Sequence, residues 1–424
     1  MAHGSRDFRR LLLLLALAAL VCLPGIAVAE DMAPAQVASA ESPGPLTPLT
    51  REDPSGGADT AKTFVAALEQ ANGEQMLAVL HGETLIARIA EGMPFTDAER
   101  IDFEQGMQVL LGNVARIIAS SAPEGFGASY RGLLVRSGGA HALVRLDMGD
   151  RGLNYFELML GRSPDGRVWI YDWYDYAQGS TYSESVRQLG ALASGDPSIM
   201  ASAGGVTGAD VEGARMAAEF VARIHAGQLQ DSLDTWHALP PEIAYAQPLL
   251  LQRIKVASML EDENEHRMAL TDLARYHEGD ARLALSLVDH YFYTGQNEKL
   301  FAALGAMNAY MGLRDTGMIN LEGAYHELLG DHIEAEALAR EAIDKEPGYE
   351  GAPGYEGAYW VLVQSLLGLE QYEQVTEALR TIETRFGYEI DPDQLALQPM
   401  YAEYARSEAY QQWKGSAAAP ARIE

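Results

Sequence analysis

The spacing of apolar residues along this chain changes from helical to alternating and then back to helical. Between residues 58 and 120, apolar side chains recur three or four positions apart, as Phe64, Val65 and Leu68 do, and this spacing predicts amphipathic helices. Thr96 and Glu99 have the spacing of a capping box, so we expect a helix to begin there.

Four segments that follow alternate apolar and polar residues with a period of two. They predict β-strands over residues 130–137, 140–148, 153–160 and 167–175. Short glycine-containing spacers separate them, and such spacers are typical of β-hairpins, so we expect an antiparallel meander. Helices followed by a meander predict an α+β domain over residues 58–192, with helices covering one face of the sheet. This order of elements resembles the NTF2-like and cystatin-like folds.

Residues 210–415 show helical spacing throughout and an internal repeat. The segment 323–335, with Ala339, Ala342 and Pro347 after it, resembles the tetratricopeptide repeat (TPR), a pair of antiparallel helices of about 34 residues. The corresponding turns fall at Gly227, Glu261, Gly295, Gly330 and residues 370–372.

The intervals between these turns are 34, 34, 35 and 40 residues, and a duplicated hexapeptide, PGYEGA in residues 347–358, accounts for the excess of six. The sequence therefore predicts five TPR-like units that stack into an α-solenoid, closed by a capping helix over residues 395–413. The expected fold class is mainly α, with an N-terminal α+β domain before the solenoid.

The N-terminus has the layout of a secretory signal peptide over residues 1–29. Arginines precede an unbroken apolar run, and Pro24 and small residues up to Ala29 follow it, so we predict cleavage after Ala29. An uncleaved anchor is the alternative, because the apolar stretch approaches the ~20 residues that span a bilayer. Cleavage predicts a periplasmic or secreted protein with no stable membrane insertion.

Three further segments have low complexity. Residues 30–57 are rich in Pro, Ala and Ser and predict a disordered tether. Residues 193–209 predict a linker between the two domains, and residues 416–424 predict a disordered tail.

The chain is strongly acidic, with 31 Lys+Arg against 60 Asp+Glu and a net charge of −29. This balance excludes a nucleic-acid binder, which needs a basic footprint, and disfavours docking on anionic lipids. Removal of the signal would leave 28 basic and 59 acidic residues, a net charge of −31, and would remove the single cysteine, Cys22. The mature chain would then have no disulfide and no thiolate chemistry.

No sequence motif of a known catalytic or nucleotide-binding site is present, so we expect no enzymatic activity and no cofactor. The nearest approach to a metal site is His266, His277 and Glu278, which lacks further converging ligands, so we expect no metal.

The strand over residues 168–176 is unusually aromatic. Taken as a regular strand, it places Trp169, Tyr171 and Trp173 on one face, where they could line a ligand pocket. His141 and Arg145 share one face of the second strand and could add polar groups to that pocket. The alternative is that these aromatic residues fill the core or an interface.

The TPR resemblance implies that the first helix of each unit lines a concave groove for a partner. The groove positions that it implies are Lys255, Met259, Arg282, Leu285, Asp289, Phe292, Tyr293, Asn320, Trp360 and Gln364. The Lys/Asn/Arg clamp that some TPR arrays use for peptide C-termini is not reproduced. Phe292 and Trp360 are either partner anchors or helix-packing residues.

The sequence therefore predicts an exported scaffold or adaptor that binds another envelope protein through its repeats. The alternative function is a small-ligand-binding or enzymatic α+β domain that the repeat array only positions. Self-association is a further option.

Overall fold

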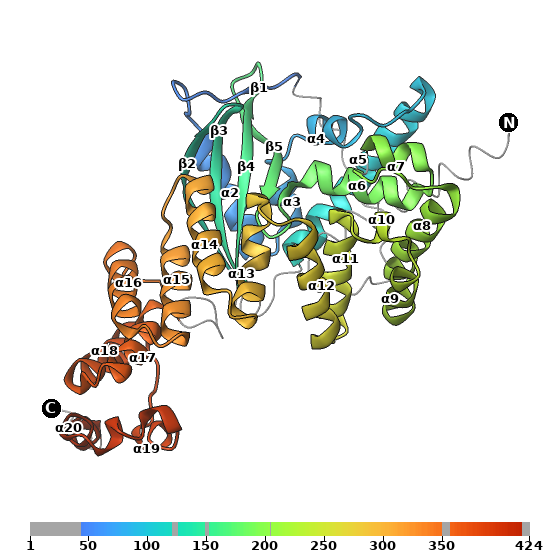
Figure 1. Cartoon of the computed structure of the whole chain (residues 1–424). Coiled ribbons are helices and arrows are strands. Elements are labelled where there is room, and N and C mark those ends of the chain that lie inside the picture. Colours follow the sequence, from blue (N-terminus) through green and yellow to red (C-terminus); the bar gives the residue numbers. More distant parts are fainter. Residues whose placement is uncertain (1–43, 121–125, 149–151, 204, 350–356, 418–424) are drawn as a thin grey trace. The chain divides into compact units, whose positions relative to one another are not determined.

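The computed structural model describes the chain except residues 1–43, 121–125, 149–151, 204, 350–356 and 418–424 (Figure 1). The predicted signal peptide, part of the tether and most of the tail therefore lie outside the described residues. The chain forms two compact units. One holds residues up to 146 and 154–307, and the other holds residues 147–153 and 308–424.

A sheet is the centre of the first unit, and its main strands follow one another in chain order. The predicted antiparallel meander is confirmed by the order β2-β3-β4-β5-β6. The strands are β1(Thr47–Pro48), β2(Phe126–Arg136), β3(Gly139–Met148), β4(Leu153–Arg162), β5(Val168–Asp175) and β6(Ser180–Thr181).

Helices precede and follow the strands, and several of them pack against the sheet, as the sequence predicted. They are α2(Gly57–Glu69), α3(Gly73–Leu77), α4(Gly82–Ile89), α5(Asp97–Ser120), α6(Tyr182–Ser194) and α7(Pro197–Ala203). Helices α2, α4 and α6 all contact β5, and fully buried side chains such as Phe64 and Ile89 form the core. The capping box is confirmed at α5, where Thr96 N–H donates to Glu99 and Glu99 N–H donates to Thr96 Oγ1.

The described part of the predicted tether is ordered against the sheet. β1 pairs with β4, and Leu49 is 2% exposed. The N–H of Leu49 donates to Leu160 O, and its carbonyl accepts from the N–H of Ala140. A proline- and alanine-rich composition predicted a free segment, but backbone hydrogen bonds to two strands and one buried leucine fix residues 47–49 in place.

The stretch predicted as a linker also carries structure. Helix α7 lies within it, and Met200 and Ala203 are buried. Helix α6, just before it, packs against two helices of the following region, α8(Val211–His225) and α11(Gln247–Met259). The division between the two compact units falls instead within α14, near residue 307.

Five helix hairpins follow, and their turns lie where the repeat predicted them. They are α8(Val211–His225) with α9(Leu229–His237), α11(Gln247–Met259) with α12(Glu263–Tyr276), α13(Ala284–Tyr293) with α14(Asn297–Met311), α15(Thr316–Leu328) with α16(His332–Lys345), and α17(Ala358–Gly368) with α18(Tyr372–Phe386). The short elements α10(Pro241–Ala244) and η2(Ala281–Leu283) precede α11 and α13.

All five turns share one backbone feature, a central residue with positive φ. The angles are 69° at Gly227, 55° at Glu261, 68° at Gly295, 79° at Gly330 and 58° at Glu370. A left-handed residue is a common way to end a helix, so a shared local geometry accompanies the shared spacing.

In the second unit, successive helices from α15 to α18 pack against one another. At Gly323, a Cβ atom would lie 3.2 Å from Leu338 Cβ, so the glycine allows α15 and α16 to approach closely. Residues after α18 form α19(Pro392–Leu395), η3(Pro399–Tyr401), η4(Tyr404–Arg406) and α20(Glu408–Ala417) instead of one capping helix. Pro399 lacks a backbone N–H and disfavours helical backbone at the residue before it, so it interrupts the predicted helix.

These short elements still cover the apolar face of the last hairpin. Tyr401, Tyr404, Tyr410 and Trp413 are buried in one cluster with residues of α17 and α18. The covering role expected of the capping segment is thus carried out by several short pieces.

Candidate functional site

The aromatic strand β5 does not present its aromatic residues on one face. In its pairing with β4, Trp173 lies opposite Leu158 and Trp169 lies opposite Gly161, with a register shift between Met159 and Leu160. Positions 158 and 161 point to opposite faces because side chains alternate along a strand. A β-bulge at Tyr171 therefore places Trp169 and Trp173 on opposite faces, and the predicted common face is wrong.

Trp173 lies in the core between the sheet and the helices. Its ring stacks on Tyr182 of α6 with centroids 4.2 Å apart, and it contacts Phe64 of α2 and Phe156 of β4 at 6.4 and 6.2 Å. It is 2% exposed. The core-filling alternative is therefore the correct one for Trp173.

Trp169 and Tyr171 are half-buried and contact neighbouring cations. The guanidinium of Arg167 lies 3.9 Å from the Trp169 ring, and that of Arg88 lies 5.7 Å from the Tyr171 ring. Trp169 Nε1 donates to Ser163 Oγ at 3.0 Å. These contacts are made within the domain, and the rings already have partners.

His141 belongs to a buried ionic cluster on the sheet that the sequence did not predict. Glu157 of β4 accepts from Arg136 Nε and Nη2 at 2.8 and 2.6 Å, and from the Tyr176 hydroxyl at 2.9 Å. His141 Nδ1 lies 2.6 Å from Glu157 Oε1. Arg145, on the same face of β3 as His141, is also buried.

The hydrogen-bond donors around Glu157 stabilise its ionised form. Burial alone would raise the pKa of Glu157, but hydrogen bonds and charges from Arg136 and His141 outweigh it and lower that pKa to about 2. His141, one of the two polar groups proposed for a pocket wall, therefore bonds to Glu157. Arg136 and Glu157 were not predicted as a pair, because they lie on different strands and meet only in the folded sheet.

Two aspartates at the end of β5 have raised pKa values. Asp172 accepts from Ser183 Oγ at 2.6 Å and from Arg88 Nε at 2.7 Å, but its burial still raises its pKa. Burial also raises the pKa of Asp175 to about 6, against hydrogen bonds from Asn154 and from the backbone N–H groups of residues 177 and 178. Asp172 thus accepts hydrogen bonds at the start of α6, and Asp175 accepts them from the turn that follows β5.

The first helical hairpins contain a second buried ionic cluster. The side chain of Arg253 in α11 is 2% exposed and pairs with two acidic residues of α12, Glu265 at 2.5 Å and Asp272 at 2.6 Å. Its guanidinium lies 3.8 Å from the Trp236 ring of α9. The cluster joins three helices and was not predicted, because its members meet only when α9, α11 and α12 pack together.

The groove positions of the first unit differ in exposure. Tyr293 is 72% exposed, and Asp289 and Arg282 are also exposed. Arg282 pairs with Asp280 at 2.6 Å. The other four positions, Lys255, Met259, Leu285 and Phe292, are half-buried. An exposed surface on and just before α13 thus remains at the predicted position.

The groove positions of the second unit are less accessible. Asn320 is 1% exposed and cannot contact a partner, so that prediction is wrong. Trp360 is half-buried, packs against the core of the last hairpin and meets the Tyr388 ring edge-on at 6.4 Å. Gln364 is half-buried. Helix-packing contacts account for Trp360, as the alternative interpretation expected.

The histidines of the described residues have other contacts and surroundings. Among the residues that the structure describes, no group of three or more His, Cys, Asp or Glu side chains could hold a metal ion. His277 Nε2 lies 3.0 Å from Tyr245 O, and burial lowers the pKa of His266.

No helix in the described part of the chain is both long and apolar enough to cross a membrane. No family model matches the chain, and neither a curated protein nor a solved structure matches it.

Proposed function

We propose that this protein is an exported scaffold or adaptor of the cell envelope, which binds another protein through TPR-like helical hairpins stacked as a solenoid. The observation that carries the proposal is the recurrence of five hairpins at the intervals of the repeat. Each hairpin has one residue with left-handed backbone at its turn. Arrays of such hairpins are interaction surfaces far more often than catalytic ones. The export part rests on the signal-like N-terminal sequence.

The surface we assign to the partner is the exposed side of η2 and α13, with Arg282, Asp289 and Tyr293. Tyr293 is 72% exposed, and Asp289 lies one helical turn before it in α13. Such a tyrosine is a suitable interface anchor, because tyrosines contribute strongly to binding at little entropic cost. The alternative function, a ligand pocket in the sheet, loses support because Trp173 and His141 are committed to the core and to Glu157.

The test is affinity purification of the tagged full chain from envelope extract, in parallel with Tyr293→Ala and Val211→Ala. Val211 is 75% exposed and lies at the start of α8, so its truncation removes a similarly exposed apolar group elsewhere. We expect a partner that is recovered with the wild type and Val211→Ala but is at least ~5-fold depleted with Tyr293→Ala.

Equal recovery with both variants would contradict the assigned surface. Export is tested separately, by fusing residues 1–58 to a reporter that is active only outside the cytoplasm. An inactive fusion would contradict the envelope location without affecting the binding result.

A further inference from the structure

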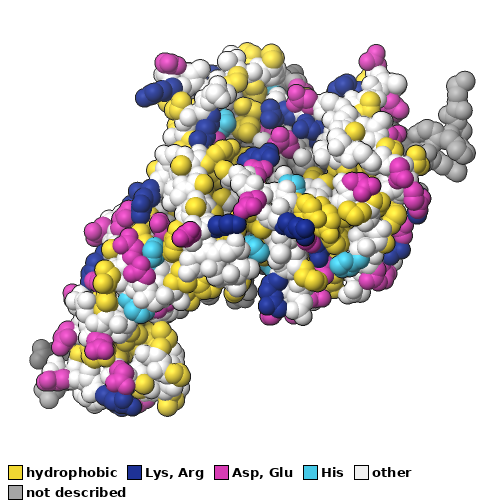
Figure 2. Space-filling model, viewed as in Figure 1, with side chains coloured by type: hydrophobic (Ala, Val, Ile, Leu, Met, Phe, Trp, Pro, Cys, Tyr) yellow, Lys and Arg dark blue, Asp and Glu magenta, His cyan; other side chains and the backbone are white. Residues whose placement is uncertain are grey.

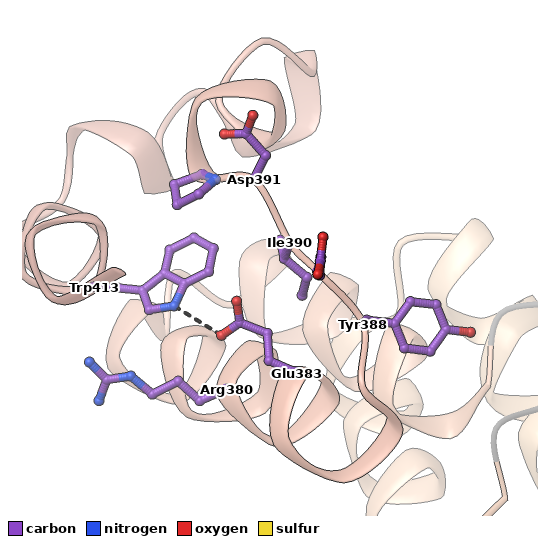
Figure 3. A pocket seen from close by; sticks show the side chains of 8 residues that line it. Arg380, Glu383, Tyr388, Ile390, Asp391 and Trp413 are labelled. Atoms are coloured by element: carbon purple, nitrogen blue, oxygen red, sulfur yellow. Dashed lines mark hydrogen bonds between the residues drawn. The ribbon is translucent and has the colours of Figure 1, made fainter. Parts of the chain in front are cut away.

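An open cavity of about 640 Å³ lies in the second unit, between the last hairpin and the C-terminal elements (Figure 3). Helix α18 contributes Arg380 and Glu383, α19 begins at one wall with Pro392, and α20 contributes Trp413. The segment 388–391 completes the lining. This volume is within the range of small-ligand sites.

The charges that line the cavity are mostly negative. Three carboxylates, those of Glu383, Glu389 and Asp391, accompany one cation, Arg380. In Figure 3 the guanidinium group of Arg380 points away from Ile390 and Tyr388. Glu383 accepts from Trp413 Nε1, and Asp391 accepts from the backbone N–H groups of Asp393 and Gln394. Lys414 of α20 forms an ion pair with Asp393, and the charge of Asp391 also acts on it.

Aromatic and apolar groups form the rest of the lining. The Trp413 indole is 2% exposed, and its Nε1 donates to Glu383 Oε2 at 3.4 Å, which fixes that carboxylate beside the ring. Tyr388 is 47% exposed, and its ring is held edge-on by Trp360. Of these two rings, that of Tyr388 is exposed enough to meet a cation, which carboxylates attract by ion pairing and an aromatic ring by its quadrupole.

Ile390, Pro392 and Trp413 provide apolar surface next to these carboxylates. Lysine and arginine carry a cationic head on an aliphatic stem, and such a side chain matches a cavity that is apolar on one side and acidic on the other. The surrounding sequence has the same sign of charge, since residues 308–424 contain 8 Lys+Arg and 21 Asp+Glu. Figure 2 shows several of these acidic side chains over α16 and α18.

We propose that this cavity binds one lysine or arginine side chain of a basic segment in a partner protein. The carboxylates of Glu383 and Glu389 neutralise the cationic head, and the apolar lining holds the stem. The acidic field of the region would steer a basic partner towards it. The inference goes beyond the function proposed above and shares no residue with the surface around Tyr293.

The test measures binding of a short labelled peptide to the full chain by fluorescence anisotropy, so it does not need the natural partner. The probes are Ac-Gly-Gly-Arg-Gly-Gly-amide, its lysine counterpart and its citrulline counterpart, which has the shape of the arginine peptide but no charge. We expect both cationic peptides to bind at least ~5-fold more tightly than the citrulline peptide, and to weaken as salt rises.

Two variants locate the site, and a third variant is the matched control. Glu389→Gln removes an exposed carboxylate from the lining, and Glu383→Gln keeps an oxygen that can accept from Trp413 Nε1. Each is expected to weaken the cationic peptides roughly 2- to 5-fold, the value of one partly exposed ion pair. Glu373→Gln removes an exposed acid from the first turn of the same helix, outside this lining, and should change binding by less than ~2-fold.

Equal affinity of the citrulline and arginine peptides would overturn the proposal, because the charge would then contribute nothing. An effect of Glu373→Gln as large as that of Glu389→Gln would also overturn it, because binding would then follow net charge instead of the cavity. Loss of the Tyr293-dependent partner in the other experiment would leave both of these outcomes unaffected.

Discussion

The two buried ionic clusters of the first unit are centred on opposite charges. In the sheet, the carboxylate of Glu157 is surrounded by donors, and its main partner Arg136 is 26% exposed at the side chain. In the hairpins, the guanidinium of Arg253 is surrounded by carboxylates, and its partner Glu265 is only 7% exposed. Asp272, the second partner of Arg253, is 22% exposed, and the His237 ring, 49% exposed, lies 3.4 Å from Glu265. Both clusters therefore reach water at their edge, but the hairpin cluster has two nearly buried charges, Arg253 and Glu265.

This difference determines what happens when the central charge is removed. Arg136 can turn towards solvent, so the sheet cluster can relieve an unpaired charge. Glu265 is 7% exposed, and without Arg253 it would keep the His237 ring 3.4 Å away but no guanidinium, or would have to take up a proton. The cost of losing a central residue should thus be larger in the hairpins than in the sheet.

The largest effect is expected for Arg253→Met. This substitution retains an apolar stem of similar length over Trp236 but leaves Glu265 buried beside no guanidinium. We expect the free energy of unfolding of the first unit to fall by about 3–5 kcal/mol, measured by urea denaturation at pH 7. Because the chain has five tryptophans, Trp236 emission reports on the first unit in a background where the other four are replaced by phenylalanine.

The control for that substitution is Arg215→Met. Arg215 pairs with Glu212 at 2.6 Å on the surface of α8, and both side chains are more than half exposed. We expect a loss below about 1 kcal/mol. If Arg253→Met cost as little as Arg215→Met, burial would not be the reason for the strength of the hairpin cluster.

Glu157→Gln is expected to cost less, about 2 kcal/mol at pH 7, the value of a hydrogen bond to a charged group. The effect should also depend on pH. The folded-state pKa of Glu157 is about 2, below its ordinary value of 4.5, so its stabilisation is present above pH 4.5 and is lost as pH falls towards 2. Urea denaturation at a series of acidic pH values should show a shallower loss of stability for the variant, and parallel curves would contradict the ionised cluster.

Asp175 is expected to show the opposite dependence, because it is buried with hydrogen-bond donors but without a cation. All three of its hydrogen bonds, from Asn154 Nδ2 and from the N–H groups of Ala177 and Gln178, reach Oδ1. Its folded-state pKa is about 6, above the ordinary 3.8, so stability is greatest below pH 3.8 and falls as pH rises through 6.

The variant Asp175→Asn keeps an oxygen for those three donors and cannot ionise. We expect it to be more stable than the wild type by about 1–2 kcal/mol at pH 8 and to match it near pH 4. Thermal denaturation at the two pH values provides the measurement. A variant that is less stable at pH 8 would show that the carboxylate is ionised and stabilising there.

The hairpin region was predictable because its signals are local. A helix turn needs a small or left-handed residue at one position, and the fixed spacing of Gly227, Gly295 and Gly330 identified the weaker turns at Glu261 and Glu370. The start of α5 was predictable for the same reason, since a capping box involves only residues three apart.

The side-chain arrangement of the sheet was not predictable from one strand. Strict alternation put Trp169 and Trp173 together, but a bulge opposite Met159 and Leu160 depends on how β4 and β5 pair. The Glu157 cluster likewise needs β2, β3 and β4 in register. The prediction of disorder at residues 47–49 was wrong for a related reason. It rested on local composition, but hydrogen bonds to strands distant in the sequence hold these residues in place.

The smallest effect tests the one local feature that all five hairpins share. Gly295 has φ 68° and a Cβ at that position would meet nothing within 4 Å, so Gly295→Ala would cost only backbone strain, about 1 kcal/mol. Glu370 has φ 58°, and Glu370→Gly should relieve that strain and stabilise the second unit by up to about 0.5–1 kcal/mol, less the entropy that glycine adds to the unfolded chain. Urea denaturation should thus show changes of opposite sign in the free energy of unfolding of the two variants. If Glu370→Gly were destabilised, contacts of the Glu370 side chain, and not the left-handed backbone, would set the stability of that turn.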